Sequence, residues 1–343
     1  MDILNVISKP YVDNSITNLE LHSYQPSVSG SFEYNDEIRI PIQEVDLYTL
    51  PGESHLYIEG KLTKDDGTKA TKLKFINNGI AFLFREIRYE LNGVTIDTNR
   101  NVGLTSTLKA YLSYSDNESV KLNNAGWFPR VHKGGEKITD DDGNFNVCIP
   151  LSVLMGFFED YTKIIINMKQ ELVLIRSSND LEAITSKDDT EKPKITINKI
   201  FWRVPHVSVD IPQQLALTKI VEKNTDIILG FRSWELIEYP SLSETTQHSW
   251  SVKTSNKLET PRHVIVAFQH DKKQKITSDM SWFDNIDLTN IRVFLNSERY
   301  PYQDLYLNLK AKKFASLYEM FSNFRQVLTT RQKKNLFMHL KNI

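Results

Sequence analysis

The side chains with which this chain could perform chemistry are few, and its only cysteine is the first to consider. Cys148 lies within the apolar strand pattern FNVCI. Cysteine is among the most deeply buried residue types, so this position favours an inert thiol in a core over a nucleophile. A single cysteine can form neither an internal disulfide nor a zinc cluster of several thiolates, and it indicates a reducing compartment.

The histidines show no spacing that would bring metal ligands together. His263 and His270 flank one apolar run, and we interpret them as the ends of a strand. The chain also lacks a Gly-rich phosphate loop before a helix and the HExxH pattern of zinc proteases. The full set is His22, His55, His132, His206, His248, His263, His270 and His339.

One acidic run, DDDGN at residues 140–144, resembles a calcium loop only in its composition. A calcium loop needs ligands at alternating positions and a distal bidentate glutamate, and this run has neither. We therefore interpret it as a solvated turn.

Four tryptophans could form a platform for stacking on sugar rings. All but Trp282 fall inside strand patterns, where large aromatic side chains normally fill a core. The four are Trp202, Trp234, Trp250 and Trp282. We predict no catalytic, cofactor-binding or metal-binding residue in this chain, and we expect it not to be an enzyme.

Basic residues gather near the C-terminus, where residues 309–343 contain a single acidic residue, Glu319. These cations could lie on the solvated face of an amphipathic helix or on a surface that contacts nucleic acid. Few aromatic residues interleave with them, so any nucleic acid contact is expected to be weak. The basic residues are Lys310, Lys312, Lys313, Arg325, Arg331, Lys333, Lys334 and Lys341.

Length and composition indicate a globular protein of two domains. The chain has 343 residues, of which 40% are hydrophobic and 25% charged. Its net charge of −1 argues against a histone-like coat on nucleic acid. No apolar stretch is long enough to span a membrane, and the N-terminus lacks the regions of a signal peptide.

Short strands joined by turns dominate the rest of the chain. Ile38, Ile40 and Ile42 alternate with polar neighbours, as expected of a half-buried strand, and strand composition recurs to residue 295, including residues 226–239 and 262–268. Residues 177–193 are polar and end in a proline, so they are the best candidate linker. With long helices nearly absent, the pattern predicts an all-β protein of the sandwich or jelly-roll type.

A hexapeptide repeat links the two halves. Residues 87–92 read IRYELN and residues 291–296 read IRVFLN, and each copy ends at a turn, marked in the first by the hairpin signal Asn92-Gly93. An amphipathic helix follows each turn. This order favours an internal duplication. The predicted core positions are Ile87, Tyr89 and Leu91 in one copy, or their alternation partners, and Ile291, Val293 and Leu295 in the other. The predicted apolar helical stripes are Leu104, Leu108, Tyr111 and Leu112, then Phe314, Leu317, Tyr318, Phe321 and Leu328.

The segments around the repeat resemble a known family. FINNGIAFLFREIRYELNGVTIDTNRNVGLTSTLKAYLSYS in the first half, and PRHVIVAFQ, NIRVFLNSERYPY and FASLYEMFSNF in the second, are similar to double jelly-roll major capsid proteins of the Polinton/Maverick and adintovirus type, in the adenovirus-hexon lineage. The resemblance covers about residues 28–328. It implies two tandem jelly-roll β-sandwiches with short helices and no active site.

The resemblance also implies the partners and the location. Three chains would form a pseudo-hexagonal capsomer, and capsomers would tile an icosahedral shell with a minor capsid or penton protein as a further partner. The protein would then belong to the virion, after synthesis in the cytoplasm and assembly there or in the nucleus. Two alternatives stay open: a host-domesticated or truncated relative that binds without assembling, and a jelly-roll carbohydrate enzyme with paired carboxylates.

The expected domains are an N-terminal arm at 1–29, a first jelly roll at 30–176, a linker at 177–193 and a second jelly roll at 194–343. The second is expected to be incomplete, because only the 15 residues 329–343 follow its helix, against 63 (115–177) after the first. We expect this half to be the less stable one. Assembly is expected to be poor unless residues beyond Ile343 are restored.

Overall fold

The structure is a computed structural model, and it describes residues 15–28, 32–44, 48–130, 138–223, 226–239, 241–253 and 261–326. Most of its ordered elements are antiparallel strands, which confirms the all-β prediction. The first sheet contains β1 (Ile16–Tyr24), β3 (Tyr48–Thr49), β4 (His55–Lys64), β8 (Asn144–Pro150), β9 (Ile165–Ile166) and β12 (Pro193–Val209). The second contains β2 (Glu37–Ile42), β6 (Phe84–Leu91), β7 (Val94–Arg100) and β10 (Gln170–Arg176).

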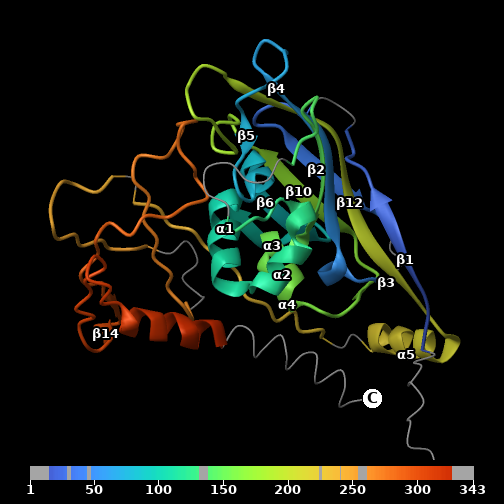
Figure 1. Ribbon diagram of the computed structural model, residues 1–343. Coiled ribbons are helices and arrows are strands. Elements are labelled where there is room, and N and C mark those ends of the chain that lie inside the picture. The colour runs from blue at the N-terminus through green and yellow to red at the C-terminus, as the bar shows by residue number, and fades with distance from the viewer. Residues whose placement is uncertain are drawn as a thin grey trace, which may run out of the picture.

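The helices are short. They are α1 (Val102–Ser113), α2 (Asp116–Lys121), α3 (Leu151–Leu154), α4 (Gly156–Asp160) and α5 (Ile211–Glu222), with 3-10 turns η1 (Pro51–Glu53), η2 (Gly79–Leu83) and η3 (Asn123–Ala125). Figure 1 shows α1 to α4 clustered on one flank of the strands, with α5 apart from them beyond the end of β12. Two further strands, β5 (Lys74–Phe75) and β11 (Ile184–Thr185), pair only with each other.

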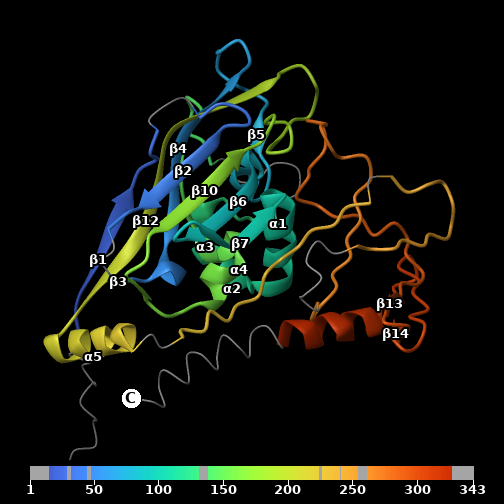
Figure 2. The ribbon, with the colours of Figure 1, turned by 180° about the vertical axis from the view of Figure 1, so that it is seen from behind.

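The strands pair in a nested order along the chain. β6 pairs with β7, β4 with β8, β2 with β10, and β1 with β12, so that each pair encloses the one before it in sequence. β12 also pairs with β4, and β10 also pairs with β6, which joins the pairs into two sheets. Figure 2 shows the second sheet from behind. Nested pairing of eight antiparallel strands in two sheets is a jelly roll, and residues 16–209 form one.

The sandwich core follows the alternation of the strands. Ile38, Ile40 and Ile42 of β2 are buried, as predicted, and so are Ile87, Tyr89 and Leu91 of β6. Burial of one such side chain contributes roughly 1.5–3 kcal/mol relative to its exposed state. The Tyr89 ring lies among the rings of Phe157, Phe158 and Trp202, at centroid distances of 4.9, 4.9 and 6.1 Å.

Helix α1 buries a different face from the one predicted. Its apolar residues Leu104, Leu108, Tyr111 and Leu112 are only half-buried. The buried face consists largely of small residues such as Gly103 and Ser106. A Cβ at Gly103 would lie 2.3 Å from Cγ of Phe82, so the helix approaches η2 too closely for large side chains.

The structure corrects the expected boundaries of the first jelly roll. Residues 16–24 form its first strand rather than an arm, and residues 193–209 form its last strand rather than the start of a second domain. The expected linker at 177–193 is packed against the sandwich. Its polar residues form hydrogen bonds with neighbouring loops. The buried Glu191 carboxylate, for example, accepts hydrogen bonds from Thr71 N, Thr71 Oγ1 and Lys72 N at 3.1, 2.6 and 2.9 Å.

The second half contains much less sheet. Within the described part of residues 226–326, the only strands are β13 (Val293–Leu295) and β14 (Glu298–Tyr300), and residues 315–326 are helical. The predicted core positions of the second repeat are wrong in this structure, because Ile291 and Val293 are half-buried and Leu295 is 44% exposed. The strand predictions for 226–239 and 262–268 are also wrong in this structure.

The second half contacts the jelly roll at several places. The Phe231 ring lies 5.3 Å from the Phe157 ring, and the Arg232 guanidinium donates to Asp160 at 2.6 and 2.7 Å. Further along, Ser186 N donates to Ile276 O at 2.8 Å. None of the described helices is long and apolar enough to cross a membrane.

Candidate functional site

The residues singled out for chemistry do not form a reactive centre. Cys148 is half-buried on β8, and burial raises the pKa of its thiol, so the nucleophilic thiolate is disfavoured at neutral pH. Among the described residues, no three His, Cys, Asp or Glu side chains are placed to hold a metal ion. His132 and His339 lie outside the described residues.

The acidic run forms a turn whose side chains satisfy its own backbone. Asp140 Oδ1 accepts from Asp142 N at 2.9 Å and from Asn144 N at 2.8 Å, and Asp140 Oδ2 accepts from Asn144 Nδ2 at 2.9 Å. These hydrogen bonds, led by the one from the Asn144 side chain, lower the pKa of Asp140. The arrangement is that of a solvated turn, as interpreted from the sequence.

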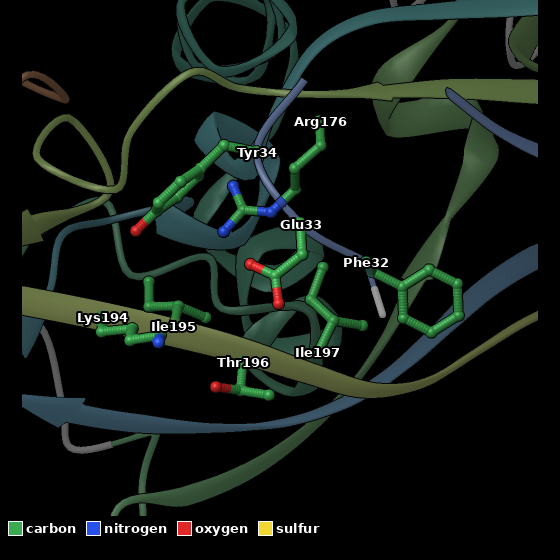
Figure 3. A pocket seen from close by; sticks show the side chains of 8 residues that line it. All are labelled: Phe32, Glu33, Tyr34, Arg176, Lys194, Ile195, Thr196 and Ile197. Carbon is green, nitrogen blue, oxygen red and sulfur yellow. The ribbon is translucent and has the colours of Figure 1, made fainter. Parts of the chain in front are cut away.

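A small cavity lies where the ends of β10 and β12 meet the loop before β2. Figure 3 shows the Arg176 side chain beside Tyr34, facing residues of β12. Arg176 Nη1 donates to Leu83 O at 2.9 Å, and its Nη2 pairs with Asp180. Asp180 Oδ2 also accepts from Tyr34 Oη and from Ile195 N, both at 2.8 Å.

This cavity is a structural junction rather than a ligand site. Its volume is about 40 Å³, against several hundred for a site that takes an organic ligand. Arg176 Nε is buried without a hydrogen-bond partner in the described structure, and a space of this size suits a water molecule. The buried ion pair between Arg176 and Asp180 joins four chain segments through the hydrogen bonds described above. Removal of one partner from such a pair lowers the stability of a fold by roughly 3–5 kcal/mol.

The four tryptophans named above differ in burial and position. Trp202 is fully buried in the core, as predicted. Trp234 and Trp282 are half-buried, and Trp250, expected inside a strand, is 43% exposed outside any described strand. A sugar-stacking platform therefore has no support in their positions.

The basic C-terminal cluster is only partly described. Lys310 lies 2.8 Å from Asp287 in an exposed ion pair, and Lys312 and Lys313 are exposed. The cations at 331, 333, 334 and 341 lie outside the described residues.

Exposed apolar side chains are the most prominent feature of the surface. Helix α5 has no buried residue, and its Ile211 and Leu215 are 73% and 57% exposed. A helix of this length is marginal in water without a packed face. On the neighbouring strand β1, Leu19 and Leu21 are also exposed.

A second exposed surface carries aromatic residues, and we call it the hairpin–helix surface. Its residues are Phe294, Leu295, Tyr300, Tyr302, Tyr306, Phe314, Tyr318 and Met320. They belong to the β13–β14 hairpin, the chain after it and the helix at 315–326. Large exposed apolar patches mark interaction sites, so both surfaces are candidates for contacts with other chains.

Solved structures of viral capsid proteins are similar to this chain at low identity. The Faustovirus major capsid protein is 11% identical over 63% of this chain and 58% of its own, with a TM-score of 0.42. The mavirus major capsid protein is 13% identical over 60% of this chain and 49% of its own, with a TM-score of 0.37. PBCV-1 VP54 is 16% identical over 61% of this chain and 47% of its own, with a TM-score of 0.35. The chain therefore spans about half the length of these proteins.

A family model gives the assignment, whereas no curated protein sequence matches the chain. The model of the double jelly roll-like domain matches residues 73–342, which include both hairpins of the hexapeptide repeat. This chain belongs to the family of double jelly roll-like domains.

Proposed function

We propose that this chain is a structural subunit of a viral capsid, of the major capsid type. The observation that carries the proposal is the presence, in one chain of this family, of a jelly roll and a second copy of its central hairpin and helix. The described residues offer no metal-binding cluster, and the cavity beside Arg176 has room for about one water. A second cavity, of about 290 Å³, lies beside the loop before β2 and the start of that strand. The surface also presents many exposed apolar side chains.

The proposed assembly is a homotrimer. Each chain would contribute two jelly-roll units, so that three chains give a pseudo-hexagonal capsomer that tiles an icosahedral shell. Such a ring requires heterologous contacts that close on themselves. The exposed faces of α5 and β1 on one side, and the hairpin–helix surface on the other, are the surfaces that these contacts would cover.

Further proposals follow from the same role. The protein would be a virion component of the Polinton/Maverick or adintovirus type, made in the cytoplasm and assembled there or in the nucleus. Its partners would be neighbouring capsomers and a minor capsid or penton protein. Contact with nucleic acid would be weak and limited to the basic C-terminal segment.

Analytical ultracentrifugation of the full chain tests the assembly, with electron microscopy of the same samples. We expect trimers that dissociate on dilution, and ring-shaped particles in the images. Leu215→Glu should weaken association about tenfold or more, because an apolar contact would acquire a buried charge. Gln214→Glu adds the same charge on a polar position of α5 and serves as the control. A monomer at all concentrations, in low and high salt, would contradict the capsid proposal.

A second candidate is a host-domesticated or truncated relative that binds a partner without assembling. The exposure of Leu295 and Phe294 on β13 favours it, because an open hairpin cannot complete a capsomer wall by itself. The same sedimentation experiment separates the two, since a binding module stays monomeric.

A further inference from the structure

Two histidines and a tyrosine meet where β1 lies against the C-terminal part of β12. The Tyr24 hydroxyl lies 2.7 Å from His206 Nε2, and the rings of His22 and His206 lie 4.2 Å apart at an angle of 35°. On the other side, His22 Nε2 lies 3.2 Å from Glu20 Oε2. The strand register explains the cluster, because Glu20 is opposite His206, and His22 and Tyr24 follow two and four pairs further along the same face of β1.

The surroundings of the His206 ring favour its neutral form over its protonated form. It is only 6% exposed, and its Nδ1 has no hydrogen-bond partner among the described residues. Burial, with a smaller contribution from Glu44, raises the pKa of Tyr24 to about 12, so its hydroxyl keeps its proton and can donate to Nε2 of the neutral ring. A protonated ring would bury a positive charge and leave its Nδ1 proton without an acceptor.

The groups around His206 come from three segments. β1 supplies His22, Glu20 and Tyr24, the chain after β2 supplies Glu44, and β3 supplies the neutral Thr49 opposite His206. Burial first, and then the positive charge that His22 can carry, lower the pKa of His206. The carboxylates of Glu44 and Glu20 act in the opposite direction and more weakly.

β1 has few contacts other than this cluster and its backbone pairing with β12. In the described structure β1 pairs with β12 alone, and every residue of the strand except Tyr24 is exposed. Its side chains therefore add little burial to the backbone pairing. Strands with few buried contacts open at the lowest cost in free energy.

We propose that His206, packed against Tyr24 and His22 of β1, forms an acid-sensitive latch that holds β1 on β12 at neutral pH and releases it when the His206 ring is protonated. Two cationic rings at this distance would repel each other inside a partly buried site. Release would uncover the edge of β12 from Trp202 to Val209, and a free strand edge can accept another strand. The latch is independent of the proposed capsid role, because it concerns the folding of one chain.

The direction of the pH dependence follows from linkage. His206 has a lower pKa with β1 in place than a solvated histidine, whose usual value is 6.5, and release of β1 would open the ring to water. Its neutral form therefore stabilises the docked strand above that value, and the stabilisation is lost as the pH falls below it. One pH unit below about 6.5, a ring that takes up its proton only after release would raise the released population about tenfold.

Hydrogen exchange measured by mass spectrometry on the full chain, at about pH 7.5 and about pH 5.5, tests the latch. Rates are normalised to the unfolded chain at each pH. We expect exchange in β1 to rise at the lower pH, by at most about tenfold, while β6 and β10 stay protected. His206→Gln, which retains a hydrogen-bonding group near Tyr24 but cannot be charged, should abolish the rise, and His22→Gln should reduce it.

Two controls separate the latch from other histidines. His248→Gln changes an exposed histidine outside the cluster, and His55→Gln changes a histidine of β4 whose pKa burial also lowers. Both variants should behave as the unmodified chain does. An equal rise in His206→Gln and the unmodified chain, or loss of protection in β1 and β6 together, would overturn the latch. If His206→Gln does not fold, an unchanged rise in His22→Gln would also overturn it.

Discussion

The β6–β7 and β13–β14 hairpins turn through the same backbone conformations. Asn92 and Gly93 have φ angles of 47° and 80°, and Asn296 and Ser297 have 49° and 69°. Positive φ at both central residues is the type I′ turn, whose twist suits a two-residue hairpin. The residue before each turn is a leucine, paired as Leu91 with Val94 and as Leu295 with Glu298.

The surroundings of the two hairpins are different. The other edge of β6 is taken by β10, which places Leu174 opposite Ile87 and Leu172 opposite Tyr89. Leu91 is 1% exposed, whereas Leu295 is 44% exposed. Among the described residues, no strand lies on the second edge of β13.

The comparison of the two hairpins shows which part of a jelly roll forms from residues that are close together in the sequence. A hairpin forms from adjacent residues, but its burial depends on strands that come much later in the chain. In the first copy β10 begins at Gln170, far beyond the end of β7 at Arg100. Residues after 326 are not described, so the helix at 315–326 is the last described element of the second copy. Among the described residues no strand pairs along 262–268, although its sequence is strand-like.

The largest expected effect comes from truncating the matched leucines. Leu91→Ala should lower the free energy of unfolding by about 3 kcal/mol, because it opens a cavity in the core. Leu295→Ala removes the same atoms from an exposed position and should cost less than about 1 kcal/mol. Urea unfolding followed by circular dichroism gives both values. Equal costs would mean that the second hairpin is buried as the first is.

Hydrogen exchange should show the same contrast without mutation. Amides of β6 and β10 should exchange only on global unfolding, whereas those of β13 and β14 should exchange through local opening, at least about a hundredfold faster. The whole of residues 226–326 should exchange faster than residues 48–130. Equal protection of both hairpins, or well-formed shells from this chain alone, would contradict the view that the second half is the less stable one.

The first hairpin could be predicted because its signals are local. Alternation placed Ile87, Tyr89 and Leu91 in the core, and Asn92–Gly93 marked the turn. The boundary of the jelly roll could not be predicted in this way. β1 pairs with β12 across most of the domain, and a polar sequence such as ITNLELHSY shows nothing of that partner.

The buried polar groups could not be predicted either, because the residues that bury them lie far away in the sequence. Lys109 of α1 is 2% exposed, and its ammonium lies 2.9 Å from Glu159 and 2.5 Å from Ser152 O. A lysine on an amphipathic helix is normally solvated, and only the position of α3 and α4 makes this one a core residue. His206 is similar, since its partners Tyr24 and His22 lie far away in sequence. The alternating pattern in KITINKIFWRV indicates a strand in this region. It does not identify the strands with which this one pairs.

The smallest expected effect concerns the one chemical difference between the two turns. Gly93 adopts its positive φ without strain, and a side chain there would contact nothing within 4 Å, so Gly93→Ser should destabilise the first hairpin by about 1 kcal/mol through the backbone alone. Ser297 occupies the same conformation with a side chain, so Ser297→Gly should stabilise the second hairpin by a similar or smaller amount, since glycine also loses more entropy on folding. Urea unfolding measures the first change, and exchange rates in β13 and β14 measure the second, which should slow about threefold. If Ser297→Gly speeds exchange instead, the two turns are not equivalent and their shared hexapeptide does not reflect a shared hairpin.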